Sequence, residues 1–174
     1  MPKLINVKLD LKLPGIGGIS GTWEPDESEV RAAWELYVEM VTRTPLGGIS
    51  PRDGSLREAL DSIYSLFDTT RGVLRRYGPG VARPKSGHEL SFGYFAVSML
   101  NLVLRPLLTE WHPKLRSWER DNPHLDESEW EERCDFLNAL DEVRAQLQQY
   151  AGLFVEVAEV PELMEGEDAT TTAA

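Results

Sequence analysis

Apolar positions are densest between residues 90 and 108, and this stretch is nearly all apolar apart from Asn101, Arg105 and Pro106. A helix with apolar residues on every face must be buried on most sides, or it must contact something other than water. We therefore expect residues 90–108 to form the most buried helix of the protein.

Two prolines predict irregularities in this helix. Pro106 has no backbone donor and predicts a kink near Leu102, and Pro113 predicts a second break or a new helical turn. The span from Leu90 to Trp111 is also long enough to cross a membrane, which takes about 20 residues. Its polar residues and proline oppose insertion, so a membrane span is the less favoured interpretation.

Three other segments repeat apolar residues every three or four positions, which is typical of amphipathic helices. They run from about 26 to 44, from 55 to 77 and from 126 to 159. Each begins with Asp or Ser followed three residues later by Glu, the pattern of a capping box. The sequence Gly-Pro-Gly at 78–80 ends the second helix.

Residues 7–13 alternate polar and apolar side chains, which predicts a half-buried strand. A Pro-Gly turn at 14–18 follows, and residues 19–23 can return as a second strand. An isolated hairpin is marginally stable in water. It must therefore pack on the helices or pair its edge with another chain, and the second arrangement would give a homo-oligomer through the N-terminal strand.

These patterns predict an all-α fold: a four-helix up-down bundle with an N-terminal β-hairpin and a disordered acidic C-terminal tail. We expect one helical-bundle domain over residues 1–160, in which residues 1–23 are the hairpin arm. Residues 161–174 form the tail.

The composition is that of a single globular domain. The chain has 174 residues, of which 41% are hydrophobic, and one cysteine, which excludes an intramolecular disulfide. The N-terminus lacks the continuous apolar segment of a signal peptide, so we expect a cytoplasmic protein.

The net charge of −11 is unevenly distributed. Residues 121–174 hold 15 acidic residues and 2 arginines, a charge of −13, whereas the first 120 residues hold 14 acids and 16 bases, a charge of +2. The acidic part would repel phosphates, so no nucleic-acid partner is expected.

Basic residues concentrate around the end of the second predicted helix. They are Arg71, Arg75, Arg76, Arg83 and Lys85, with no acidic residue between them. Cations at this position complement the helix dipole. The same cluster would also fit an anion or an acidic partner, or pairing with the acidic fourth helix.

The chain contains no recognisable catalytic set. The glycines at 15–21 lack the third glycine of a dinucleotide loop and the lysine of a Walker loop. The three histidines are far apart, and Glu127, Glu131 and Asp135 are expected to form a solvent-exposed helix face. Cys134 is expected to be a small core thiol. We predict no cofactor and no metal.

The candidate partner-binding surface lies around the apolar helix. It comprises Arg105, Trp111, His112, Tyr94 and Trp118. A charge in an apolar helix is costly unless it is paired, so Arg105 is expected to have a carboxylate or carbonyl partner. It either forms an internal ion pair or anchors a groove lined by Trp111, Trp118 and Tyr94, residue types that favour interfaces.

The run SLFDTTRGVLRRYGPGVARP, followed by LSFGYFAVSMLNLVLRPLLTEWHP, resembles all-helical bacterial proteins of conflict, or defence, gene clusters. These are small components that accompany caspase-like proteases and TPR proteins. The resemblance covers roughly residues 20–120 and transfers no functional residues. It implies an adaptor or regulatory role, with a protease or a TPR effector as the protein partner.

The sequence therefore predicts a non-enzymatic protein-interaction module of a bacterial defence system. Two alternatives stay open. One is an enzyme with a site in the bundle core near Arg105, and the other is a membrane-active effector that uses residues 90–108.

Overall fold

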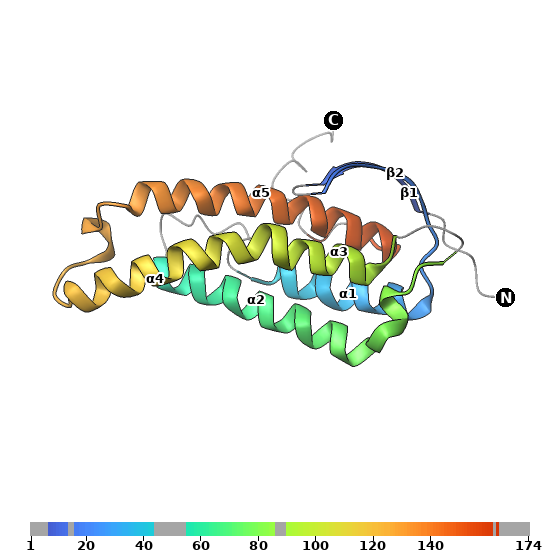
Figure 1. The fold of residues 1–174 in the computed structure, drawn as a ribbon, viewed down its shortest axis with the longest axis horizontal. Coiled ribbons are helices and arrows are strands. Elements are labelled where there is room, and N and C mark those ends of the chain that lie inside the picture. Colours follow the sequence, from blue (N-terminus) through green and yellow to red (C-terminus); the bar gives the residue numbers. More distant parts are fainter. Residues whose placement is uncertain (1–6, 14–15, 44–54, 86–89, 162, 164–174) are drawn as a thin grey trace, which may run out of the picture.

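The computed structural model describes residues 7–13, 16–43, 55–85, 90–161 and 163. The protein is mostly helical with a small antiparallel sheet near the N-terminus (Figure 1). The elements are strands β1 (Val7–Leu13) and β2 (Gly17–Trp23) and helices α1 (Glu27–Val41), α2 (Leu56–Tyr77), α3 (Phe92–Ser98), α4 (Arg105–Asp121) and α5 (Arg133–Val157). Three short helical segments, η1 (Gly78–Ala82), η2 (Met99–Leu104) and η3 (Glu127–Glu129), lie between them. The predicted disordered tail lies almost entirely outside the described residues.

The predicted hairpin is confirmed. Strands β1 and β2 pair antiparallel from Val7 opposite Trp23 to Leu13 opposite Gly17. Gly17 has a φ of +86°, a left-handed conformation that glycine adopts without strain. Val7, Leu13 and Trp23 are buried in the common core, and β1 contacts α5. The hairpin is therefore stabilised by packing on the helices, as a marginal two-stranded ribbon requires.

The predicted starts of α1 and α2 are also confirmed. Asp26 caps α1 in a reciprocal capping box with Glu29, and the Ser55 hydroxyl caps α2 by accepting from the Glu58 N–H at 3.4 Å. Gly78, with a φ of +69°, ends α2 where the Gly-Pro-Gly sequence predicted it. The last helical residue of α1 is Val41.

The apolar stretch forms one continuous helical segment over α3, η2 and α4. The predicted kink near Leu102 takes the form of a π-helix, in which the Arg105 N–H donates to the Leu100 carbonyl five residues earlier. A wider turn relieves the clash between the Pro106 ring and the carbonyl one turn before it. The predicted break at Pro113 is wrong, because α4 continues through it to Asp121.

The predicted start of the last helix at residue 126 is also wrong. Asp126 forms a capping box with Glu129, but this box opens the single 3-10 turn η3. Trp130 then has an extended backbone, and its buried ring packs against Trp111 and Trp118 with centroid distances of 6.0 and 6.2 Å. This packing turns the chain before α5 begins at Arg133.

The buried carboxylate of Glu29 joins four segments of the fold. It is 1% exposed, and in the part of the chain that the structure describes it accepts from four donors. They are Trp23 Nε1 at 3.3 Å, the Asp26 N–H at 3.0 Å, the Phe92 N–H at 3.0 Å and Lys85 Nζ at 2.5 Å. The carboxylate therefore fixes β2, the start of α1, the chain after η1 and the start of α3 relative to one another.

The charge of Glu29 is balanced by Lys85, which also contacts Asp26 Oδ2 at 2.6 Å. Partial desolvation lowers the pKa of Lys85, but its hydrogen bonds and charge contacts with Asp26 and Glu29 outweigh this and raise the pKa above its usual value. Desolvation likewise raises the pKa of Asp26, yet the bond to Lys85 and the Glu29 N–H hold it below its usual value. Lys85 and Asp26 are thus stabilised in their charged forms.

We expect Glu29→Ala to lower the free energy of unfolding by about 3 kcal/mol or more, because it leaves the Trp23 indole and the Phe92 N–H without an acceptor and Lys85 without its buried partner. Urea denaturation followed by circular dichroism measures this. The matched control is Glu27→Ala in the same turn of α1, where the side chain is exposed and pairs with Arg31. Equal stability of the two variants would contradict the role of Glu29.

Candidate functional site

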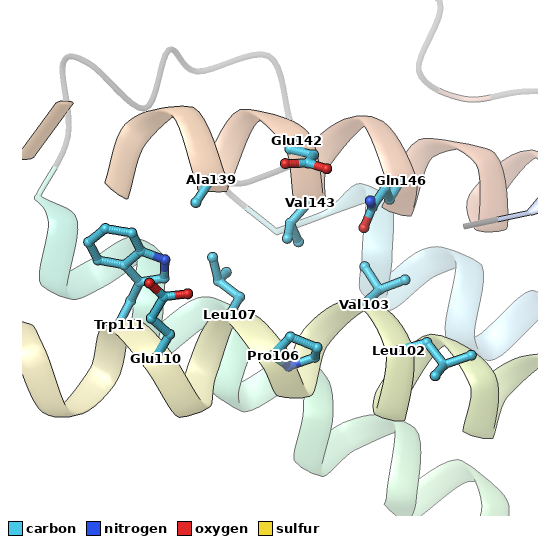
Figure 2. A pocket seen from close by; sticks show the side chains of 10 residues that line it. All are labelled: Leu102, Val103, Pro106, Leu107, Glu110, Trp111, Ala139, Glu142, Val143 and Gln146. Carbon is cyan, nitrogen blue, oxygen red and sulfur yellow. The ribbon is translucent and has the colours of Figure 1, made fainter. Parts of the chain in front are cut away.

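An open groove of about 200 Å³ lies between the η2–α4 segment and α5 (Figure 2). Its floor and walls are mainly apolar, and its lining comes from two elements that are distant in the sequence. The lining residues are Leu102, Val103, Pro106, Leu107, Glu110 and Trp111 from η2 and α4, and Ala139, Glu142, Val143 and Gln146 from α5. The groove is hence a surface feature of the helix pair.

The groove opens where Pro106 on α4 and Ala139 on α5 contribute small side chains to the space between the two helices (Figure 2). The neighbouring Val103, Leu107 and Val143 are buried and close its base. Helix α5 packs more extensively on α1 than on α4, so the seam between α4 and α5 is the looser side of the core.

Acidic and amide groups border the apolar lining. Glu110 on α4 and Glu142 on α5 are exposed, and Gln146 lies one turn beyond Glu142 (Figure 2). Glu110 contacts Lys114 at 3.4 Å, but Lys114 approaches Glu132 more closely, at 2.9 Å. The hydrogen bond to Glu132 is also the main cause of the raised pKa of Lys114. The groove edge is therefore negatively charged.

Exposed apolar side chains extend the groove toward the start of α3. Tyr94, Val97 and Leu102 are 38%, 43% and 46% exposed on successive turns of α3 and η2. Desolvation raises the pKa of Tyr150 on α5 to about 12, and the charge of Tyr94 adds to the rise. Exposed apolar side chains thus continue from the groove at Leu102 along the same helical segment to Tyr94, and we call this apolar surface from Tyr94 to Trp111 the seam.

The five predicted partner-binding residues do not meet in one groove. Trp111 lines the groove, whereas Tyr94 is exposed outside the groove lining, at the other end of the seam. Trp118 packs against Trp130, in an aromatic cluster that also contains Trp111 and Phe136. Trp111 and Trp118 thus hold the end of the core together, and Trp111 alone of the two lines the groove.

Arg105 and His112 face α2, away from the groove. Arg105 was expected to have a carboxylate or carbonyl partner, but its side chain is exposed and forms no ion pair with another described residue. The guanidinium lies over the Phe67 ring, 5.6 Å from the centroid, and the His112 ring lies 6.2 Å from that of Tyr64. The apolar helix is therefore buried on fewer sides than its composition predicted.

The predicted basic cluster divides into structural and free residues. Lys85 neutralises Glu29, and Arg76 pairs with Glu35 of α1. The suggested pairing of these residues with the acidic last helix is thus wrong. Arg71, Arg75 and Arg83 are exposed, and none of them forms an ion pair with another described residue.

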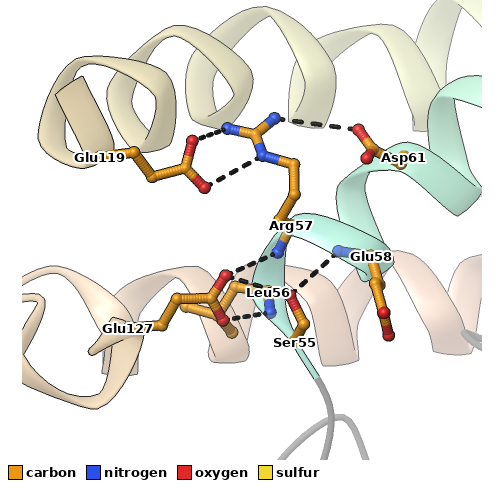
Figure 3. Close-up of polar contacts among 7 residues, drawn as sticks. All are labelled: Ser55, Leu56, Arg57, Glu58, Asp61, Glu119 and Glu127. Carbon is orange, nitrogen blue, oxygen red and sulfur yellow. Dashed lines mark hydrogen bonds and ion pairs between the residues drawn. The ribbon is translucent and has the colours of Figure 1, made fainter. Parts of the chain in front are cut away.

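Glu127, which precedes the last helix, lies against the first turn of α2 (Figure 3). Glu127 accepts from the Ser55 hydroxyl at 3.1 Å and from the Leu56 and Arg57 N–H groups at 2.6 and 3.2 Å. It therefore caps α2 from a distant part of the chain. The expectation that it shares a solvent-exposed helix face with Glu131 and Asp135 is wrong.

Arg57 strengthens the same junction. Its guanidinium binds both carboxylate oxygens of Glu119 at 3.1 and 2.6 Å and lies 3.8 Å from Asp61 (Figure 3). The hydrogen bond to Glu119 is the largest cause of the raised pKa of Arg57. The start of α2 is thus tied to the end of α4 and to η3.

The described residues contain no group of three or more His, Cys, Asp or Glu side chains that could hold a metal ion. Cys134 is exposed, so the prediction of a core thiol is wrong. Within the described chain, one helical segment, Phe92–Asp121, is long and apolar enough to cross a membrane. Half of its most apolar window is buried inside the protein.

Comparisons with family models, with curated proteins and with solved structures found no match to this chain.

The groove residues on α5 and the contact made by Glu127 were not predicted from the sequence. In the sequence, nothing distinguishes Ala139, Glu142 and Gln146 from other positions of an amphipathic helix. The available signal was the width of the apolar face over residues 90–108. It exceeds what one buried helix face needs, which is why contact with something other than water was one of its two interpretations.

We expect Arg105→Ala to change the free energy of unfolding by less than about 1 kcal/mol, since an exposed cation over an aromatic ring contributes little. Thermal and urea unfolding measure this. Arg57→Ala is the comparison, because it removes a bidentate pair at a helix junction and should cost more. A larger loss of stability for Arg105→Ala would support the interpretation that Arg105 forms an internal ion pair.

We expect Glu127→Ala to lower the free energy of unfolding by about 1–2 kcal/mol, since it removes the cap of α2. Glu131→Ala is the control, an exposed glutamate of the same segment. Hydrogen exchange should show the loss at the Leu56 and Arg57 amides. Unchanged exchange there would show that Glu127 does not hold this end of α2.

Proposed function

We propose that this protein is a non-enzymatic protein-interaction module that binds its partner in the groove between α4 and α5. The observation that carries the proposal is the exposed apolar seam, in which Tyr94, Val97 and Leu102 lead into the groove that ends at Trp111. Soluble proteins seldom leave contiguous large apolar side chains exposed without a binding role.

The chemistry of the groove supports binding over catalysis. Of the ten lining residues, Glu110 and Glu142 are the ones with ionisable side chains, and both are exposed at the edge. The other lining residues include no nucleophile and no histidine. Arg105, on which the alternative of a core enzyme depended, lies over Phe67 on the side that faces α2.

We also propose that the helices form a four-helix up-down bundle in the cytoplasm. The contacts of α1 with α2 and α5, and of α4 with α2 and α5, support a closed ring of neighbours. The helices lie along the long axis in alternating directions (Figure 1), which also supports it. The resemblance to components of bacterial defence clusters supports an adaptor role, with a protease or TPR effector as partner. Self-association through the N-terminal strand stays a prediction.

We expect Leu102→Glu to abolish partner binding, because it places a charge in the apolar seam. The matched control is Leu125→Glu in the connection between α4 and α5, since Leu125 is 47% exposed and Leu102 is 46% exposed. Affinity purification of both variants and the unchanged protein from native lysate, with quantitative mass spectrometry, measures the loss. Thermal melts of the two variants should agree within a few degrees.

A protein recovered near equal amounts with the unchanged chain and with Leu125→Glu, but lost with Leu102→Glu, supports the proposal. A partner that Leu102→Glu retains would place binding outside the groove. Recovery of the chain with membranes, abolished by Leu102→Glu, would instead favour the membrane-active effector, for which the length of the segment Phe92–Asp121 is the supporting observation.

A further inference from the structure

We infer that the partner presented to this groove is an amphipathic helix whose apolar stripe is flanked by lysine or arginine residues. This inference rests on the proposed function and specifies its partner. It is carried by the length of the apolar seam, by the position of its exposed side chains and by the charge on its two edges.

The seam has the dimensions of a helix. Tyr94 and Trp111 mark its two ends, and the 17 positions that separate them along the helical segment correspond to about 25 Å. A partner helix of about 17 residues would cover this length. The seam runs between two helices, so a third helix can lie along it with its apolar face inward.

The seam offers separate contact points at helical spacing. Val97 and Leu102 are exposed one π-helical turn apart, and the groove opens beyond Leu102 at Pro106. Because the turn over Met99–Leu104 is wide, the exposed apolar residues stay on one face across the irregularity. A partner with apolar residues at i, i+3 or i+4 and i+7 would match this surface.

The two edges of the groove determine the charge of the partner. Glu110 lies on the α4 edge and Glu142 on the α5 edge, so cations on both sides of the apolar stripe would be favoured (Figure 2). On the α4 side, one cation, Lys114, is shared by Glu110 at 3.4 Å and Glu132 at 2.9 Å, and Arg105 is directed at Phe67 on the opposite side. The carboxylates beside the groove therefore outnumber the cation that pairs with them.

The same charges disfavour two other occupants. An anionic lipid surface would be repelled by Glu110 and Glu142. A second copy of this chain would have to bring a basic amphipathic helix to the groove, whereas α5 is rich in acidic residues and α1 exposes Glu27 and Arg31 already paired with each other. Both occupants remain measurable outcomes of the test.

The test uses the full chain and three fluorescein-labelled helical peptides of about 18 residues. All three carry the same leucine stripe at i, i+3 or i+4 and i+7 in an alanine background, and their flanking positions carry lysine, glutamine or glutamate. Fluorescence anisotropy gives each Kd. We expect the lysine peptide to bind about tenfold more tightly than the glutamine peptide and the glutamate peptide to bind most weakly.

Two double variants locate the charge effect. Glu110→Gln with Glu142→Gln should remove the preference for the lysine peptide, and higher salt should weaken it in the unchanged chain. The control is Glu58→Gln with Glu156→Gln, which changes the net charge equally at exposed residues outside the lining of the groove. This control should keep the preference.

The outcomes separate this inference from the proposed function. Equal binding of all three peptides that Leu102→Glu abolishes would overturn the basic partner and leave the groove as the binding site. Lysine-peptide binding that survives Leu102→Glu would overturn both. Binding of none of the peptides overturns the helical partner, while the lysate experiment still decides the proposed function. Self-association in sedimentation that Leu102→Glu disrupts would assign the groove to a second copy of the chain. Vesicle binding that the same variant disrupts would assign the groove to lipid.

Discussion

The arrangement of the whole fold depends on one buried charge, the Glu29 carboxylate. An ionised carboxylate in a protein interior is unfavourable unless donors and a cation surround it, and Glu29 has both. Its donors come from the hairpin, from α1, from the chain after η1 and from the start of α3. The direction in which α3 enters the core is thus set by this carboxylate, and η2 and α4 follow in the same helical segment.

That direction brings the apolar helix to α5 with one face left exposed. The π-helix before Pro106 widens the turn, and the small side chains of Pro106 and Ala139 leave part of the space between α4 and α5 unfilled. At the far end, the rings of Trp111, Trp118 and Trp130 close the core. The groove therefore follows from the packing of the core helices, and it does not need a separate binding element.

Local signals in the sequence predicted the local structure well. The capping residues Asp26 and Ser55 and the glycine stop at Gly78 act on the backbone within a few residues, so sequence spacing suffices to find them. The surroundings of Arg105 and the burial of Cys134 were not predicted correctly. Exposure depends on which neighbours a helix contacts and on the register shift of a π-helix. Glu127 caps a helix some 70 residues away in the chain, a contact that no periodicity encodes.

The uneven distribution of charge along the chain affects the charge at the edge of the groove. The excess of acidic residues after residue 120 contributes the α5 edge of the groove, whereas the nearly neutral first 120 residues supply Glu110 and most of the apolar lining. An acidic surface beside exposed leucine and valine side chains attracts cationic amphipathic segments and repels anionic surfaces. Such a surface also limits the association of one copy with the acidic face of another. Solubility and partner selection can thus arise from the same carboxylates.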